Sequence, residues 1–165
     1  RSLIKTMPNM PNMIERTLRY PGHIELMRVF RESGFFSKEE IDIKGKKIRP
    51  LDLTSKLLFP QWKLGDEEKE FTVMRVIVSG LENNKQVTYT YDLLDRYDAA
   101  TKTSSMARTT GYTCTGAARL ILENKFTRKG VSTPEFVGED ENCFNTMINY
   151  LKERNINYRM HKTMH

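Results

Sequence analysis

The stretch from Phe71 to Tyr97, FTVMRVIVSGLENNKQVTYTYDLLDRY, decides the fold. Its first part, Phe71 to Ser79, is rich in β-branched residues, and its second part, Gln86 to Leu94, alternates apolar and polar side chains. Both patterns are typical of β-strands, and the glycine and asparagines of Gly80 to Asn84 are typical of a turn. The sequence therefore predicts two long antiparallel strands. Their aromatic face can pack on helices or pair with another subunit, and we favour core packing.

Helix-like and strand-like patterns precede these strands. Ile24 to Ser33 carries its apolar side chains on one broad side of a helical wheel, which predicts a helix. A short hairpin is expected from Ile41 to Arg49, turning at Lys44-Gly45. Pro50 to Phe59 is expected to form a short helix that ends at Pro60, because proline lacks the backbone donor that a helix interior needs.

Similar patterns follow the strands. A helix is predicted within Ser104 to Glu123, with one narrow face of small side chains that would allow tight packing against the sheet or access for a ligand. That face consists of Ala107, Gly111, Cys114 and Ala118. Asp140 can cap a second helix with an apolar stripe that runs from Cys143 to Leu151, and a final strand is expected around Tyr158. The whole pattern predicts the α+β class, with a mostly antiparallel or mixed sheet covered by helices.

Length and composition narrow the class of protein. The chain has 165 residues with 38% hydrophobic and 29% charged residues, which fits one globular domain without a membrane-spanning segment. Its two cysteines lack metal-like spacing, so we expect reduced thiols and a cytoplasmic protein. The net charge is +6, but basic residues cluster only around Gly45, at Lys44, Lys46, Lys47 and Arg49. Such a cluster is typical of a solvated turn, so no nucleic-acid partner is predicted. His161 and His165 are expected in a frayed terminus, and no metal site is predicted.

The sequence contains no familiar catalytic motif. The patterns of zinc proteases, nucleophile elbows, paired CxxC thiols and glycine-rich dinucleotide turns are all missing from it. No catalytic residue is therefore identified, and any chemistry is expected to need another domain.

Four segments carry a family resemblance. They are ERTLRYPGH (Glu15–His23), YDLLDRYD (Tyr91–Asp98), SMARTTGYT (Ser105–Thr113) and KGVSTPE (Lys129–Glu135). In this order they resemble landmarks of the C-terminal region of the saccharopine dehydrogenase family, in particular its saccharopine reductase and lysine 6-dehydrogenase branches. The resemblance spans about Glu15 to Arg154.

The resemblance implies a division of labour within a longer enzyme. Residues 1–165 would be a single C-terminal domain for substrate binding and homodimerisation, with the architecture of a glyceraldehyde-3-phosphate dehydrogenase C-terminal domain. A Rossmann domain outside this sequence would bind NAD or NADP, and the enzyme would oxidise or form a C–N bond of an amino acid of the lysine or saccharopine type. In saccharopine reductases the matching TLR contacts the amino-dicarboxylate substrate, which here points to Thr17, Leu18 and Arg19. An alternative is an oligomerisation scaffold whose parent has lost catalysis.

The residues of the TLRYPGH segment suit a carboxylate site. The guanidinium of Arg19 can bind a carboxylate through two hydrogen bonds, and the first helical turn after Pro21-Gly22 would present free backbone N–H groups. Thr17 could add a hydroxyl, and Tyr20 and His23 could orient substrate or move a proton. The other interpretation is a plain helix entry with Arg19 in a structural ion pair, and for His23 both remain open.

Arg108 is the second candidate for a substrate contact. It lies near the expected start of the helix within Ser104 to Glu123, beside the face of small side chains. A surface arginine without a functional role is the alternative.

Overall fold

The structure is a computed structural model that describes residues 2–65 and 68–165. The chain forms two compact units. Unit 1 consists of Arg1–Pro8 with Asp66–His165, and unit 2 consists of Asn9–Gly65. The single domain expected from the sequence therefore contains two units, and their membership of one domain stays a prediction.

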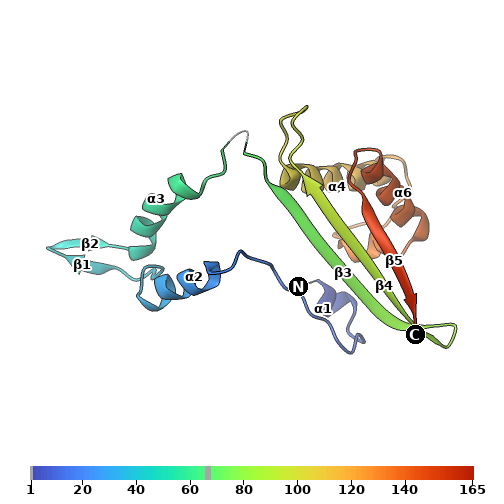
Figure 1. The fold of residues 1–165 in the computed structure, drawn as a ribbon, viewed down its shortest axis with the longest axis horizontal. Helices are drawn as coiled ribbons and strands as arrows, with labels where there is room; N and C mark the ends of the chain where they lie inside the picture. Colours follow the sequence, from blue (N-terminus) through green and yellow to red (C-terminus); the bar gives the residue numbers. More distant parts are fainter. Residues whose placement is uncertain (1, 66–67) are drawn as a thin grey trace. The chain divides into compact units, whose positions relative to one another are not determined.

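Unit 1 is built on a three-stranded antiparallel sheet in the order β3 (Phe71–Glu82), β4 (Lys85–Arg96) and β5 (Tyr158–Met164) (Figure 1). The hairpin between β3 and β4 is confirmed, but its strands are longer than predicted. Its turn contains only Asn83 and Asn84, whose φ angles are 51° and 62°. Two central residues with positive φ form the turn that best follows the twist of paired strands, so the ladder continues to the pair Glu82 and Lys85.

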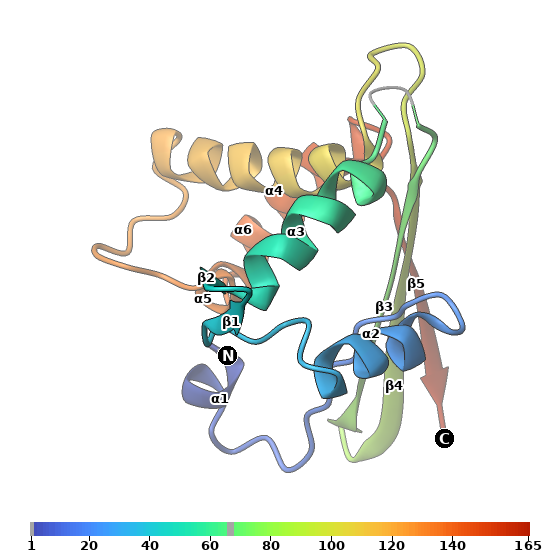
Figure 2. The ribbon, with the colours of Figure 1, turned by 90° about the vertical axis from the view of Figure 1, so that its left-hand side faces the viewer.

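Helices cover one face of this sheet. Figures 1 and 2 show α4 (Ser105–Leu122) and α6 (Glu141–Lys152) on the same side, while the shorter α5 (Pro134–Gly138) precedes α6. Leu93 of β4, Leu151 of α6 and Ile156 form a buried cluster in the core, against which Tyr112 and Tyr158 pack. Core packing of the helix-facing side is therefore confirmed at Leu93.

Side chains cap the starts of both predicted helices, and the cap at Asp140 was predicted. The side chain of Ser104 accepts a hydrogen bond from the Ala107 N–H, and that of Asp140 accepts one from the Cys143 N–H. Each cap satisfies a backbone donor that the first helical turn leaves unpaired. These caps fix where α4 and α6 begin.

The packing face predicted for α4 is wrong. Ala107, Gly111 and Ala118 are exposed, while the buried residues of the helix are Ser105, Arg108, Gly116 and Leu120. The burial of Leu120 removes more apolar area from water than the small face could, so the helix turns that side inward. Cys114, at the border of the small face, lines a cavity that is described below.

The C-terminal residues are ordered by strand pairing, so the expectation of a frayed terminus is wrong. His161 lies within β5 opposite Thr90 of β4, and the His165 N–H donates to the Gln86 carbonyl at 2.9 Å. A strand that completes its hydrogen bonds with a long neighbour does not fray like a free tail. Ile156 is buried just before this strand.

Unit 2 contains α2 (His23–Glu32), the hairpin β1 (Ile41–Ile43) and β2 (Lys46–Ile48), and α3 (Pro50–Trp62). The hairpin and both helices are confirmed, but Pro60 lies inside α3 instead of ending it. Only two residues of the helix follow Pro60. Because the lost hydrogen bond falls in the exposed last turn, water can replace it.

The remaining element is a single short helix. In unit 1, α1 (Leu3–Thr6) precedes the boundary with unit 2, and the Ser2 hydroxyl donates to the Glu135 carboxylate at 2.5 Å. This hydrogen bond ties the chain start to α5. Within the described residues, no helix combines the length and apolar character needed to cross a membrane.

Candidate functional site

The TLRYPGH segment forms a tight turn at the entry to α2. The His23 N–H donates to the Tyr20 carbonyl at 3.1 Å, and Gly22 has φ and ψ of 86° and −21°. This is a type II turn, which favours proline at its second position and requires positive φ, hence glycine, at its third. The Pro-Gly pair therefore turns the chain directly into the helix.

The side chains before the turn point into solvent. Leu18 and Tyr20 are 74% and 76% exposed, and Thr17 and Arg19 are also exposed. The Nη1 atom of Arg19 donates to the Leu18 carbonyl at 2.9 Å. Within unit 2, no carboxylate pairs with Arg19. Its remaining N–H groups are thus available to an acidic ligand.

His23 is the first residue of α2 and is half-buried. Its own N–H is already used by the turn, and Gly22 brings no side chain to cap the helix. A bound carboxylate would therefore use the next N–H groups of the helix start, where Glu25 already places a negative charge. The start of α2 therefore offers fewer backbone donors than expected, and the anion site stays a prediction.

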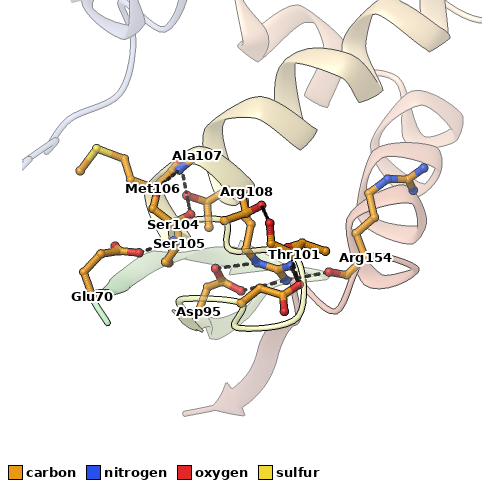
Figure 3. Close-up of polar contacts among 12 residues, drawn as sticks. Glu70, Asp95, Thr101, Ser104, Ser105, Met106, Ala107, Arg108 and Arg154 are labelled. Atoms are coloured by element: carbon orange, nitrogen blue, oxygen red, sulfur yellow. Dashed lines mark hydrogen bonds and ion pairs between the residues drawn. The ribbon is translucent and has the colours of Figure 1, made fainter. Parts of the chain in front are cut away.

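Arg108 occupies a different setting, in unit 1 (Figure 3). It is only 8% exposed, so the alternative of a plain surface arginine is wrong. Its Nε and Nη2 atoms contact the two Asp95 carboxylate oxygens at 3.3 and 3.4 Å, and its Nη1 donates to Asp98 at 3.1 Å. Nη2 also donates to the Arg154 carbonyl at 2.8 Å.

These contacts use most of the donors of Arg108. A guanidinium has five N–H groups, and four contacts to protein oxygens leave it little capacity for a substrate carboxylate. The side chain joins the end of β4, the loop that follows it and the turn after α6, as Figure 3 shows around the labelled Arg108. We therefore assign Arg108 a structural role here, and a substrate contact stays a prediction.

The loop after β4 is itself held by Asp98. Its carboxylate accepts hydrogen bonds from the Thr101 hydroxyl at 2.9 Å and the Ala100 N–H at 3.0 Å. These hydrogen bonds, together with the positive charge of Arg108, hold the pKa of Asp98 below its ordinary value. The Glu70 carboxylate accepts from the Ser105 N–H at the start of α4 (Figure 3), so a second acid anchors the same corner.

The sequence analysis missed both acidic partners of Arg108. Asp95 is 5% exposed and lies in β4, with Asp98 three residues later. The signal was present in YDLLDRYD, because an aspartate at a core-facing strand position needs a buried cationic partner. A shallow pocket of about 360 Å³ opens beside this cluster, lined by Leu94, Asp95, Arg96, Asp98, Arg108 and Asn155.

The predicted site residues therefore fall into two groups. Thr17, Leu18, Arg19, Tyr20 and His23 lie together around one turn of unit 2, whereas Arg108 belongs to unit 1. Across the described ranges, no group of three or more His, Cys, Asp or Glu side chains could hold a metal ion.

One comparison with known proteins identifies the family. The family model of the saccharopine dehydrogenase C-terminal domain matches residues 2–156. The match includes the TLRYPGH turn of unit 2 and the Arg108 cluster of unit 1, and it covers most of the chain. The chain thus belongs to the saccharopine dehydrogenase C-terminal domain family.

Proposed function

We propose that this chain is the substrate-binding and dimerisation domain of an NAD(P)-dependent oxidoreductase that acts on the C–N bond of an amino acid of the lysine or saccharopine type. Family membership supports an oxidoreductase as the parent. The nicotinamide cofactor would be held mainly by another domain of the parent, where it would exchange a hydride with the substrate carbon. The substrate carboxylate would bind at the TLRYPGH turn.

The observation that carries this proposal is the free guanidinium of Arg19. Its side chain donates a hydrogen bond to the neighbouring Leu18 carbonyl, and no carboxylate of unit 2 pairs with it. A planar guanidinium donates two parallel hydrogen bonds to a carboxylate, and an acidic substrate carries such a carboxylate. The adjacent Thr17 and Tyr20 hydroxyls are exposed beside it and can donate to the same group.

The roles within the turn follow from position. The Pro21-Gly22 turn fixes the path of the backbone between Arg19 and the start of α2. The Arg19 side chain is therefore attached to an ordered segment. His23, half-buried at the first helical position, would orient the substrate or move a proton. These residues bind and position the substrate, and the acid or base of the reaction is not assigned.

The test is a hydride-transfer assay on the full-length parent. Oxidation of saccharopine and of lysine is followed with NAD and with NADP, in the parent, an Arg19→Ala variant and an Arg28→Ala control on α2. Loss of a charge-assisted hydrogen bond of about 1.5–3 kcal/mol predicts a KM for the amino acid that rises roughly 10- to 100-fold in Arg19→Ala. The Arg28 variant should keep the parental KM, and an unchanged KM in Arg19→Ala would sink the assigned role.

A scaffold without catalysis is the second candidate function. It is favoured by β3, an edge strand whose Ile77 and Leu81 side chains are 61% and 76% exposed. Free edges with apolar side chains pair readily with another chain. A parent that dimerises yet transfers no hydride with any of these amino acids would support the scaffold instead.

A further inference from the structure

Unit 1 contains a large apolar cavity on the helix-covered side of its sheet. The cavity measures about 810 Å³ and lies among β3, β4, α4, α6 and the segment before α5. Its apolar lining includes Val76, Val78, Ile121, Phe126, Phe144 and Ile148. Small-molecule sites typically have volumes of roughly 300–1,000 Å³ and mostly apolar walls with a few polar groups.

The cavity exists because α4 turns short side chains toward it. Thr110, Thr113, Cys114 and Ala117 form this part of the wall. The Thr113 hydroxyl donates to the Thr109 carbonyl at 2.7 Å, so it is satisfied within the helix and leaves its methyl group for the cavity. Opposite these residues, Val76 and Val78 of β3 remain 42% and 53% exposed. An apolar ligand would remove this surface from water.

One charged residue lies in the wall. Arg128 is the single charged side chain among the lining residues, and its guanidinium lies 3.5 Å from the centre of the Phe136 ring. No carboxylate among the described residues of unit 1 pairs with Arg128. Ring stacking orients the guanidinium without using its hydrogen-bond donors.

A buried hydroxyl lies four residues further along the same segment. Ser132 also lines the cavity, and its Oγ atom is buried without a hydrogen-bond partner in the described structure. Buried polar atoms without partners cost free energy, so a ligand that hydrogen-bonds to Ser132 would recover it. Arg128 offers an anionic head group its charge, and Ser132 offers it a hydroxyl once that side chain turns toward the cavity.

We propose that this cavity binds a linear aliphatic monocarboxylate. The apolar chain would lie between the short side chains of α4 and the valines of β3, and the carboxylate would pair with Arg128 and accept a hydrogen bond from Ser132. A lysine- or saccharopine-type substrate carries charges along its length and does not suit this apolar wall. The site is therefore additional to the amino-acid site proposed at Arg19.

The test uses decanoate and the uncharged decan-1-ol as probes of the whole chain. Isothermal titration is expected to give saturable one-to-one binding of decanoate. Arg128→Gln should weaken decanoate binding more than tenfold while it leaves decan-1-ol unchanged, because only the acid loses its ion pair. The control is Lys129→Gln, a neighbouring cation that does not line the cavity, and it should bind decanoate like the parent.

A second variant and a chemical readout complete the test. Val78→Trp, at an exposed strand position that accepts an aromatic side chain, should fill the cavity and abolish binding of both probes. Cys114 lines the cavity and is exposed, so bound decanoate should slow its alkylation. Absence of saturable decanoate binding overturns the proposal. So does binding that survives Arg128→Gln and Val78→Trp unchanged, which would mark adsorption elsewhere.

Discussion

Arg108 is the residue whose contacts most affect unit 1. Its side chain is 9% exposed and that of Asp95 is 5% exposed, so the pair is shielded from water. Removal of one partner of a buried pair leaves the other charge uncompensated, which typically costs about 3–5 kcal/mol. We expect Arg108→Met to lower the free energy of unfolding by that amount, measured by urea denaturation followed by circular dichroism.

An exposed ion pair on the same sheet provides the control. Arg75 pairs with Asp92 at 2.6 Å, with side chains 65% and 32% exposed. Such surface pairs contribute little to stability, so Arg75→Met should change the unfolding free energy far less than Arg108→Met does. Equal losses in the two variants would show that burial of Arg108 is not what makes its contacts important.

At the scale of one element, two glycines of α4 have opposite surroundings. A Cβ atom at Gly111 would meet nothing within 4 Å, whereas one at Gly116 would lie 2.9 Å from the Met147 sulfur and 3.0 Å from Cδ1 of Tyr150. Alanine gains about 1 kcal/mol over glycine inside a helix. We expect Gly111→Ala to stabilise the chain by up to that amount, as measured by chemical denaturation.

Gly116→Ala receives the same gain in helix propensity, but the Met147 and Tyr150 side chains of α6 must shift to admit the new Cβ atom. Overpacking typically costs about 1–3 kcal/mol, so this variant should be neutral to destabilising. Each glycine serves as the control for the other, because both lie in the interior of α4. Stabilisation by both substitutions would contradict the close approach of α4 and α6 at Gly116.

At the scale of the whole molecule, the free edge of β3 is where we expect two copies to pair. This strand of 12 residues pairs only with β4 and leaves its other edge open in the described structure. Pairing with a second copy would satisfy the open backbone groups and cover apolar side chains such as Ile77. We expect a homodimer, which Ile77→Lys should convert to monomer in sedimentation velocity experiments, because edge lysines oppose strand pairing.

The control for the assembly experiment is a lysine on the other edge of the sheet. Thr163 is exposed on β5, which pairs only with β4. Thr163→Lys should leave the dimer intact. If it dissociates the dimer while Ile77→Lys does not, the interface lies at β5 and the proposed use of β3 is wrong.

The sequence by itself determined the features that rest on local interactions. The β-branched run at Phe71–Ser79 and the alternation at Gln86–Leu94 predict their hairpin, because strand patterns depend on the order of side chains alone. The cap at Asp140 and the turn at Pro21-Gly22 were predictable for the same reason, since each involves residues only a few positions apart. The sequence left open whether Arg19 is exposed or held in an ion pair. The structure shows that it is exposed.

Only the tertiary structure decided the features that depend on distant residues. Arg108 is buried because Asp95 and the Arg154 carbonyl reach it from other elements, which no helical wheel can reveal. The C-terminal strand is ordered because it pairs with the free edge of β4. The sequence of the terminus does not reveal this partner, so it predicts fraying. The packing of α4 against α6 and the sheet likewise set which face of α4 is buried. The free energy of burial depends on the surface that a side chain packs against, and the local sequence pattern does not specify that surface.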